Sequence, residues 1–252
     1  MAKNRITDKG RKRQRRGYGA GTDNRPWLTV RDFSSSGKSF RVLGDVTNRV
    51  HQLLSTLEYK VFSSFDWNPL VTDIREQCSL PLEETTSIAL ELGIRHPTHK
   101  GKPVVMSTDF YVILKNRSVA ITVKYSRKLT KRAIQKFEIE KEYWRRKGVS
   151  FYIVTEREIN PIEYKNLQLF KYCQHITLPS IGEERFKQEL RKHHEYPDAT
   201  LSQFLRILAE ELNVRFGDLK QFAQYLAFNR KIIFDLSLHE FDQLKALNYA
   251  IH

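Results

Sequence analysis

Three polar residues lie at the open end of a predicted β-hairpin, and their types suit the binding of a divalent cation. The segment STDFYVILKNRSVAITVK, residues 107–124, reads as two strands joined by a tight turn at 115–118. Asp109 begins the first strand, and Thr122 and Lys124 flank a valine at the end of the second. Alternate residues of a strand face the same side, so Thr122 and Lys124 point together and lie across from Asp109.

A fourth polar residue, Glu58, lies on the apolar face of a predicted helix. The segment VHQLLSTLEYKVFSSFDW has apolar residues at helical spacing from Leu53 to Phe65. On a helical wheel Glu58 falls between Val61 and Phe62, where a carboxylate is costly unless it is paired, protonated or bound to a metal. Taken alone, this position fits a buried salt bridge and a site residue equally well.

Together these residues predict a site for phosphodiester hydrolysis with Mg²⁺. Carboxylate oxygens suit this hard ion, which keeps several waters and takes further ligands from substrate phosphate. One ion activates a water, and a second, about 3.5–4 Å away, stabilises the leaving oxygen. Lys124 would orient the water or offset charge on phosphorus. A chance surface Asp and Lys would give the same pattern in the hairpin. The carboxylate of Glu58 on an apolar helix face is a second, independent feature, and a single metal site accounts for both features.

Helices and strands alternate around these residues. VTDIREQCSLPL reads as a strand ending at Pro81, and Pro97 and Pro103 mark a loop before the hairpin. TKRAIQKFEIEKEYWRRK reads as a helix and is followed by a strand at 151–155. Glu140 again lies on the apolar side of its helix. This order predicts an α/β fold in which a mixed sheet is flanked by helices.

A second, smaller unit begins near residues 160–161. Thr200 caps a helix with an apolar face, a turn at 214–217 leads to a second helix through Phe228, and KIIFDL reads as a strand. Helix, turn, helix, strand is the order of a winged-helix unit and also of many small α+β modules. We therefore expect a basic tail at 1–17, an α/β domain at 18–165 and a winged-helix-like domain at 166–252.

The charge balance points to a polyanionic partner. Forty-three Lys and Arg against 29 Asp and Glu give a formal net charge of +14, and neutralising phosphates releases counterions. An anionic membrane surface would satisfy the same charge. Residues 1–16 contain eight Lys and Arg residues and one acidic residue, Asp8, and they have no apolar periodicity. This composition predicts a disordered DNA-gripping tail rather than a mere solubility tail. The predicted DNA-binding residues are Lys3, Arg5, Lys9, Arg11, Lys12, Arg13, Arg15 and Arg16.

Cysteine usage and hydropathy predict the compartment. Cys78 and Cys173 form neither a disulfide framework nor a CxxC motif, which fits a reducing cytosol. The sequence has no run of eighteen apolar residues and no apolar segment typical of a signal peptide. We therefore expect a soluble cytoplasmic protein with no membrane partner.

The sequence resembles the TnsA family, the endonuclease subunits of heteromeric cut-and-paste transposases. The resemblance rests on RPWLTV, VHQLLSTLE, DIREQ, GIRHP, VMSTDF, the VK of AITVK, EIEKEYW and EINP, and it covers roughly residues 25–161. It implies a restriction-endonuclease-like domain that uses one or two Mg²⁺ ions, with Mn²⁺ as a substitute. It further implies that this domain cuts the 5′ strands at transposon ends, while a separate TnsB-type transposase cuts and joins the 3′ strands.

The resemblance also assigns roles to individual residues. Glu58 and Asp109 match metal ligands, and Lys124 matches the catalytic lysine. Two residues before the lysine the family commonly has a glutamine ligand, where this sequence has Thr122, whose hydroxyl is a shorter and weaker donor. Glu140 matches an acidic position of the family and could assist, the alternative being a buried partner of Lys136 or Arg132.

The resemblance implies partners as well. They are transposon-end DNA, a TnsB-type transposase and a TnsC-type AAA+ ATPase that docks on the C-terminal domain, in a bacterial, nucleoid-associated setting. The mixed charge of the C-terminal domain favours a protein partner over DNA. The alternative function is a catalytically impaired DNA-binding and bridging subunit that lost a ligand at Thr122. A winged-helix transcription regulator with a basic arm would leave two buried carboxylates without a role.

Overall fold

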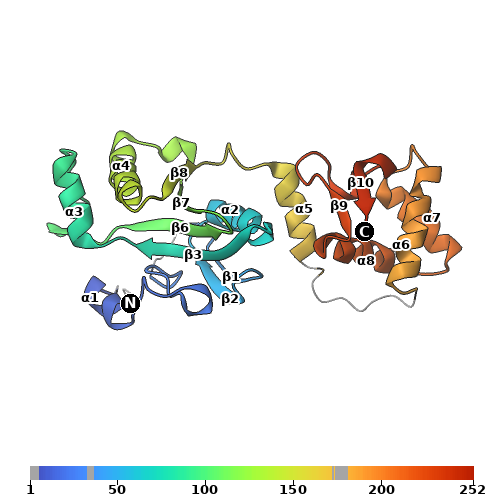
Figure 1. The fold of residues 1–252 in the computed structure, drawn as a ribbon, viewed down its shortest axis with the longest axis horizontal. Helices are drawn as coiled ribbons and strands as arrows, with labels where there is room; N and C mark the ends of the chain where they lie inside the picture. Colours follow the sequence, from blue (N-terminus) through green and yellow to red (C-terminus); the bar gives the residue numbers. More distant parts are fainter. Residues whose placement is uncertain (1–5, 33–36, 172, 174–180) are drawn as a thin grey trace. The chain divides into compact units, whose positions relative to one another are not determined.

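The computed structural model of the protein describes residues 6–32, 37–171, 173 and 181–252. The chain divides into two compact units, Met1–Ile159 and Asn160–His252 (Figure 1). The boundary falls earlier than the one expected after residue 165, because helix α5 (Pro161–Lys171) belongs to the second unit. Asn166 of this helix donates hydrogen bonds to two backbone carbonyl groups of that unit.

A mixed sheet in the order β3-β6-β7-β8 forms the centre of the first unit. Its strands are β3 (Val71–Ser79), β6 (Ser107–Leu114), β7 (Ser118–Val123) and β8 (Ser150–Val154). β3, β6 and β7 pair antiparallel, whereas β8 pairs parallel with β7. The predicted hairpin is confirmed, because Ile113 pairs with Ser118 across the expected turn.

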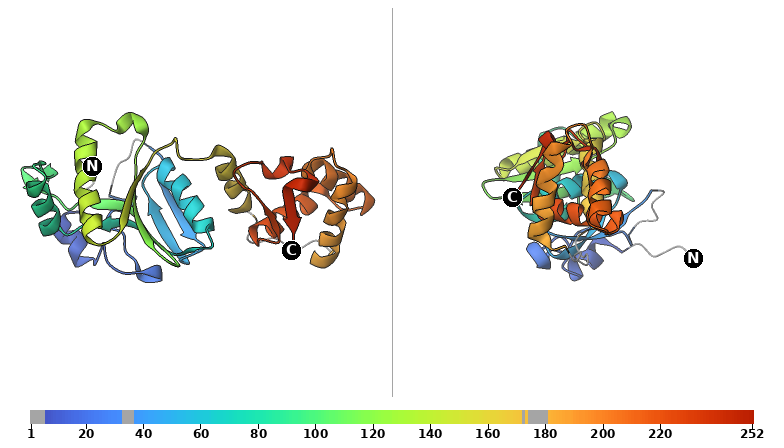
Figure 2. Two further views of the ribbon diagram at one scale, coloured as in Figure 1. Left: turned by 45° about the horizontal axis from the view of Figure 1, so that its top comes forward. Right: turned by 90° about the vertical axis from the view of Figure 1, so that its right-hand side faces the viewer.

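Two helices cover the sheet from opposite sides (Figure 2). They are α2 (Thr56–Trp67) and α4 (Lys131–Arg146). Trp144 of α4 stacks on Tyr111 and shares a core cluster with Ala120, so one face of the sheet packs against α4. α2 contacts β3 and β7 from the side of the small β1–β2 hairpin. The expected α/β architecture, a mixed sheet flanked by helices, is therefore confirmed.

Three local expectations are wrong. The predicted helix began at VHQLL, but residues Arg49–Leu53 form strand β2, which pairs with β1 (Phe40–Gly44). Alternate residues of β2 are buried, so its period is that of a strand. The predicted strand ending at Pro81 stops at Ser79, and the loop expected at Pro97 and Pro103 contains the short pair β4 (Thr98–His99) and β5 (Lys102–Pro103). Helix α3 (Leu82–Glu91), for which no element was predicted, precedes this pair.

The N-terminal segment is ordered where a disordered tail was expected. Residues Asp8–Arg13 form helix α1, capped by the Thr7 side chain, and a 3-10 turn follows at Gly21–Asp23. The Val105 N–H donates to Asp8, and the Arg11 guanidinium lies 5.5 Å from the Trp27 ring centroid. The expectation of disorder is therefore wrong for residues 6–17, while residues 1–5 lie outside the described residues.

The second unit packs helices around a small hairpin. It contains α5, α6 (Glu183–Arg191), α7 (Leu201–Glu211), α8 (Phe216–Phe228), β9 (Ile232–Phe234) and β10 (Tyr249–Ile251). Thr200 and Gln203 form a capping box at the start of α7, and β9 pairs antiparallel with β10. The order helix, turn, helix, strand matches the expectation, and the winged-helix assignment stays a prediction. Among the described residues, no helix is long and apolar enough to cross a membrane.

Candidate active site

Glu58 is fixed at the first turn of α2 by its own helix cap. Its Oε2 accepts a hydrogen bond from the Leu54 N–H at 2.9 Å, and its Oε1 accepts one from the Ser55 hydroxyl at 2.9 Å. Ser55 Oγ in turn accepts the Glu58 N–H, as in a reciprocal N-terminal cap. Burial, followed by the charge of Asp109, raises the pKa of Glu58 to about 8. The Glu58 side chain is thus held in place by hydrogen bonds, and its raised pKa indicates that nearby positive charge does not offset its burial.

Asp109 on β6 lies against the end of β7, as the hairpin predicted. Its Oδ2 accepts the Val123 N–H at 2.7 Å, at the residue between Thr122 and Lys124. Burial raises the pKa of Asp109, whereas the hydrogen bonds and the charge of Lys124 act in the opposite direction. The structure therefore brings Glu58, Asp109 and Lys124 together, although they come from a helix and two strands.

Glu140 and Thr122 form a separate buried contact beside this pair. Glu140 Oε2 accepts hydrogen bonds from the Thr122 hydroxyl at 2.7 Å and from the Thr108 hydroxyl at 3.0 Å. The Trp144 indole N–H donates to Thr108 Oγ1. Burial is the main reason that the pKa of Glu140 rises to about 8. The expected alternative partner Arg132 donates instead to the Arg95 carbonyl oxygen and the Gln135 side chain.

Gln77 on β3 belongs to the site, although the sequence interpretation did not select it. Its Nε2 donates to Asp109 Oδ1 at 2.9 Å, and its side chain also hydrogen bonds Glu58. Its Oε1 accepts the Ser107 hydroxyl at 3.1 Å. The available signal was its place in the DIREQ block, one of the segments on which the family resemblance rests.

The donor set suits a hard divalent cation. Among the residues that the structure describes, no group of three or more His, Cys, Asp and Glu side chains could hold a metal. Mg²⁺ does not require such a group, because it commonly binds one or two carboxylates and completes its shell with water and substrate phosphate. Glu58 and Asp109 supply two carboxylates whose mutual repulsion a cation would relieve. The residues therefore fit the ion that the sequence predicted, with Thr122 as a ligand still a prediction.

A buried ionic network holds the β1–β2 hairpin against β3 next to the site. The Arg49 guanidinium donates to Glu76 Oε1 and to the Ile74 carbonyl oxygen, and the His51 ring bonds Glu76 Oε2 at 2.9 Å. Burial raises the pKa of Glu76, but the bonds from His51 and Arg49 outweigh it and lower this pKa to about 2. Glu76 directly precedes Gln77, so the network fixes the backbone at which Gln77 enters the site.

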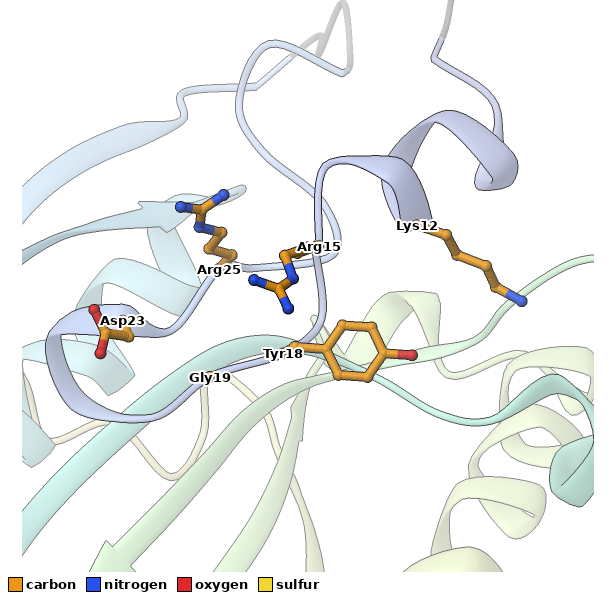
Figure 3. Close-up of a pocket in the computed structure, with 6 residues that line it drawn as sticks. All are labelled: Lys12, Arg15, Tyr18, Gly19, Asp23 and Arg25. Carbon is orange, nitrogen blue, oxygen red and sulfur yellow. The ribbon is translucent and has the colours of Figure 1, made fainter.

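A basic cavity of about 680 Å³ lies in the N-terminal segment (Figure 3). It is lined by Lys12, Arg15, Tyr18, Gly19, Asp23 and Arg25. Arg25, which the sequence interpretation missed, adds a third cation to the predicted Lys12 and Arg15. The surrounding segment is tied to β3, since the Gly21 N–H donates to Asp73.

The other predicted DNA-binding residues have different environments. Arg11 pairs with Asp8 and Arg16 pairs with Asp32, so both cations are partly neutralised. Lys9 and Arg13 are exposed on α1. Lys3 and Arg5 lie outside the described residues. The cavity cations are therefore better placed for a polyanion than the two paired arginines.

The mixed sheet between helices, with two carboxylates and a lysine at the open end of its hairpin, fits an endonuclease-like fold. Residues 68–156 match the family model described as TnsA-like endonuclease N terminal. The transposon Tn7 transposition protein TnsA of Escherichia coli is 45% identical over 157 residues, which cover 61% of this chain and 58% of that protein. The resemblance seen in the sequence is confirmed for this part of the chain, which is similar to the TnsA-type endonucleases.

The family model covers most of the candidate site. Gln77, Asp109, Lys124 and Glu140 lie inside the matched residues, whereas Glu58 precedes them. The match ends before the second unit, whose function therefore remains a matter for proposal.

Proposed function

We propose that this protein is a Mg²⁺-dependent DNA endonuclease that cleaves the 5′ strands at transposon ends as one subunit of a heteromeric transposase. The observation that carries the proposal is the convergence of Glu58, Asp109 and Lys124 at one end of the β6–β7 hairpin. It rests further on the similarity of residues 68–156, which include Asp109 and Lys124, to the TnsA-like endonuclease N terminal model, and of the chain to the Tn7 protein TnsA.

The chemistry assigns a task to each group. When bound, a divalent cation supplies a Lewis acid and an activated water. Glu58 and Asp109 would hold the cation, since hydrogen bonds from backbone N–H groups already fix the positions of both carboxyl groups. The Lys124 ammonium lies near Asp109 and would offset the charge that develops on the phosphate oxygens. Glu140 keeps the end of β7 in place through Thr122.

The proposed partners follow from charge and from the family. The Lys and Arg side chains of the N-terminal cavity would bind the DNA backbone. At the carboxylates of Glu58 and Asp109, Mn²⁺ would be able to replace Mg²⁺. The second unit would dock a TnsC-type AAA+ ATPase, and a TnsB-type transposase would process the 3′ strands. We place this assembly in the bacterial cytoplasm, on the nucleoid when it is active.

A strand-specific cleavage assay tests the proposal. It combines transposon-end DNA, the TnsB-type transposase, the TnsC-type ATPase with ATP, Mg²⁺ and this protein. Wild type should cut the 5′ strands, and Asp109→Asn, which keeps the size of the side chain, should not. Glu138→Gln, an exposed change on α4, is the control and should cut like wild type. Cutting by Asp109→Asn at the wild-type rate would refute the site.

One observation favours a second function, that of a non-cleaving DNA-binding and bridging subunit. The Thr122 hydroxyl donates to Glu140, which holds this short side chain beside Glu140 at the position where the family commonly has a longer glutamine ligand. The same assay separates the two functions. If 3′ joining proceeds with no 5′ cleavage by wild type, the bridging function holds, and Thr122→Gln is the variant expected to restore cutting.

A further inference from the structure

Gln77 has an unusual backbone conformation at a position that points into the candidate site. Its φ is +49°, in the left-handed region that residues with a side chain seldom adopt inside a strand. On either side of it the ladder is regular, because Glu76 pairs with Phe110 and Cys78 pairs with Thr108. Gln77 therefore lies directly opposite Asp109, at a local interruption of the β3–β6 pairing.

Neighbouring contacts account for this conformation. The Gln77 carbonyl oxygen accepts the Trp27 N–H at 2.9 Å, so the N-terminal segment holds the backbone at this position. Glu76, one residue earlier, is fixed by Arg49 and His51. Such strained residues persist where the surrounding structure over-determines them, and they are common at functional sites.

The side chain of Gln77 bridges the two candidate ligands. A primary amide has two N–H donors and one strong acceptor. Here the amide nitrogen serves Asp109 and Glu58, and the oxygen accepts the Ser107 hydroxyl. The three contacts also fix the direction of the amide, because the Ser107 hydroxyl holds its oxygen away from the carboxylates. The amide thus bridges the two carboxyl groups and, because it is neutral, adds no charge that would oppose the binding of a cation.

No smaller or differently charged side chain meets all of these conditions. Asparagine tolerates a positive φ but is one methylene too short to bridge both carboxylates. Glutamate has the length but lacks the donors and adds a third negative charge. Glycine adopts this φ without strain and has no side chain. These differences allow the backbone and the amide of Gln77 to be tested separately.

We propose that Gln77 is a positioning residue, whose amide aligns the carboxylates of Glu58 and Asp109 for a divalent cation and whose left-handed backbone delivers the amide to them. The inference rests on the proposed function, because it concerns the same metal site. It assigns a role to a residue of β3, a strand that lies outside the hairpin that carries Asp109 and Lys124.

Cation binding by the full-length protein tests this role without cleavage. Mn²⁺ binding is measured by titration calorimetry for wild type, Gln77→Gly, Gln77→Glu, Asp109→Asn and the control Gln52→Ala. Thermal unfolding in EDTA is measured in parallel. Changes in residues that orient metal ligands typically weaken binding about 10–100-fold, and we expect a loss in this range for Gln77→Gly. Its melting temperature in EDTA should stay close enough to that of wild type for the variant to remain folded, because relief of the positive φ partly offsets the loss of the buried amide and its hydrogen bonds.

The glutamate variant adds a readout that a purely structural role would not change. In EDTA its three neighbouring carboxylates should lower the melting temperature below that of wild type, and Mn²⁺ should restore it. Should Gln77→Gly fail to fold, this cation-dependent rescue decides the question by itself. Gln52→Ala, which alters a neighbouring glutamine of β2, should bind Mn²⁺ like wild type.

The outcomes distinguish the inference from the function on which it rests. If wild type binds Mn²⁺, Asp109→Asn does not and Gln77→Gly binds within about twofold of wild type, the role of Gln77 is refuted and the metal site stands. If Asp109→Asn binds as well as wild type, or wild type does not bind, both are refuted. A large loss of Mn²⁺ affinity in a Gln77→Gly variant that remains folded at the temperature of the titration supports the positioning role.

Discussion

Replacing Glu140 by glutamine should remove a pH-dependent cost from the folded protein. Glu140 is buried, and its pKa rises from an ordinary value of 4.5 to about 8, chiefly through loss of water. The hydroxyls of Thr122 and Thr108 donate to its Oε2, and an amide oxygen can accept the same two bonds. The substitution therefore keeps the contacts on this oxygen and removes the ionisation.

The sign and size of the effect follow from proton linkage. The folded state holds the proton more tightly than the unfolded state, so the stabilisation is complete below the unfolded pKa of 4.5. It is lost as the pH rises through the folded pKa of about 8. At about 1.4 kcal/mol per pKa unit, the full loss is on the order of 5 kcal/mol. The new amide nitrogen, if left without an acceptor, costs about 1–3 kcal/mol at every pH.

The two stability curves should therefore cross. In urea unfolding with EDTA, Glu140→Gln should be less stable than wild type at about pH 4.5 and more stable at about pH 8.5. Glu138→Gln, on the exposed side of the same helix, should follow wild type at both. Titrating groups that do not interact with Glu140 contribute equally to both curves, so the difference reports Glu140 together with its coupling to Asp109 and Lys124. Parallel curves over this range would refute the reasoning from burial.

Four further outcomes are expected. Lys124→Ala should lower the rate of 5′ cleavage about 10²–10³-fold with DNA binding unchanged, as measured by gel shift and cleavage assays. Mn²⁺ affinity should rise up to about tenfold per pH unit below pH 8, because Glu58 must lose its proton to bind, and a calorimetric pH series that stays flat would contradict this. Arg49→Met should cost about 3–5 kcal/mol in urea unfolding, since it leaves Glu76 buried with one partner fewer. Arg25→Ala should weaken DNA binding and reduce the slope of log K against log salt by about one, whereas an unchanged slope would exclude a phosphate contact.

Local sequence patterns predicted most of the elements that carry the site. The hairpin was predicted because apolar alternation and a short polar turn have a purely local origin, and the pairing of Ile113 with Ser118 confirms it. Thr130 and Thr200 cap their helices by bonds that span three residues, and such short-range geometry is readable from sequence. By contrast, the apolar residues just before Glu58 fit both the helical and the strand period, and only their pairing with β1 decides that this segment is a strand.

The N-terminal segment shows where composition misleads. Its density of cations suggested a tail without structure, because such chains bury too little apolar surface to fold by themselves. In the structure, Asp8 and Asp32 pair with Arg11 and Arg16, and Trp27 is buried. The Asp8–Arg11 pair is local, at i and i+3, but the Arg16–Asp32 pair and the bond from the Val105 N–H to Asp8 join residues distant in sequence, so no local rule could have predicted those two contacts.

The sequence by itself determined which side chains are candidates for the chemistry: Glu58 by its place on an apolar helix face, and Asp109 and Lys124 by the alternation of a hairpin. The tertiary structure alone decided how they are held. Gln77 reaches the site because a network around Glu76 and a bond from Trp27 turn its backbone to a positive φ. Residue type and period are properties of the local chain, whereas the direction of a buried amide depends on contacts that form only when distant segments pack.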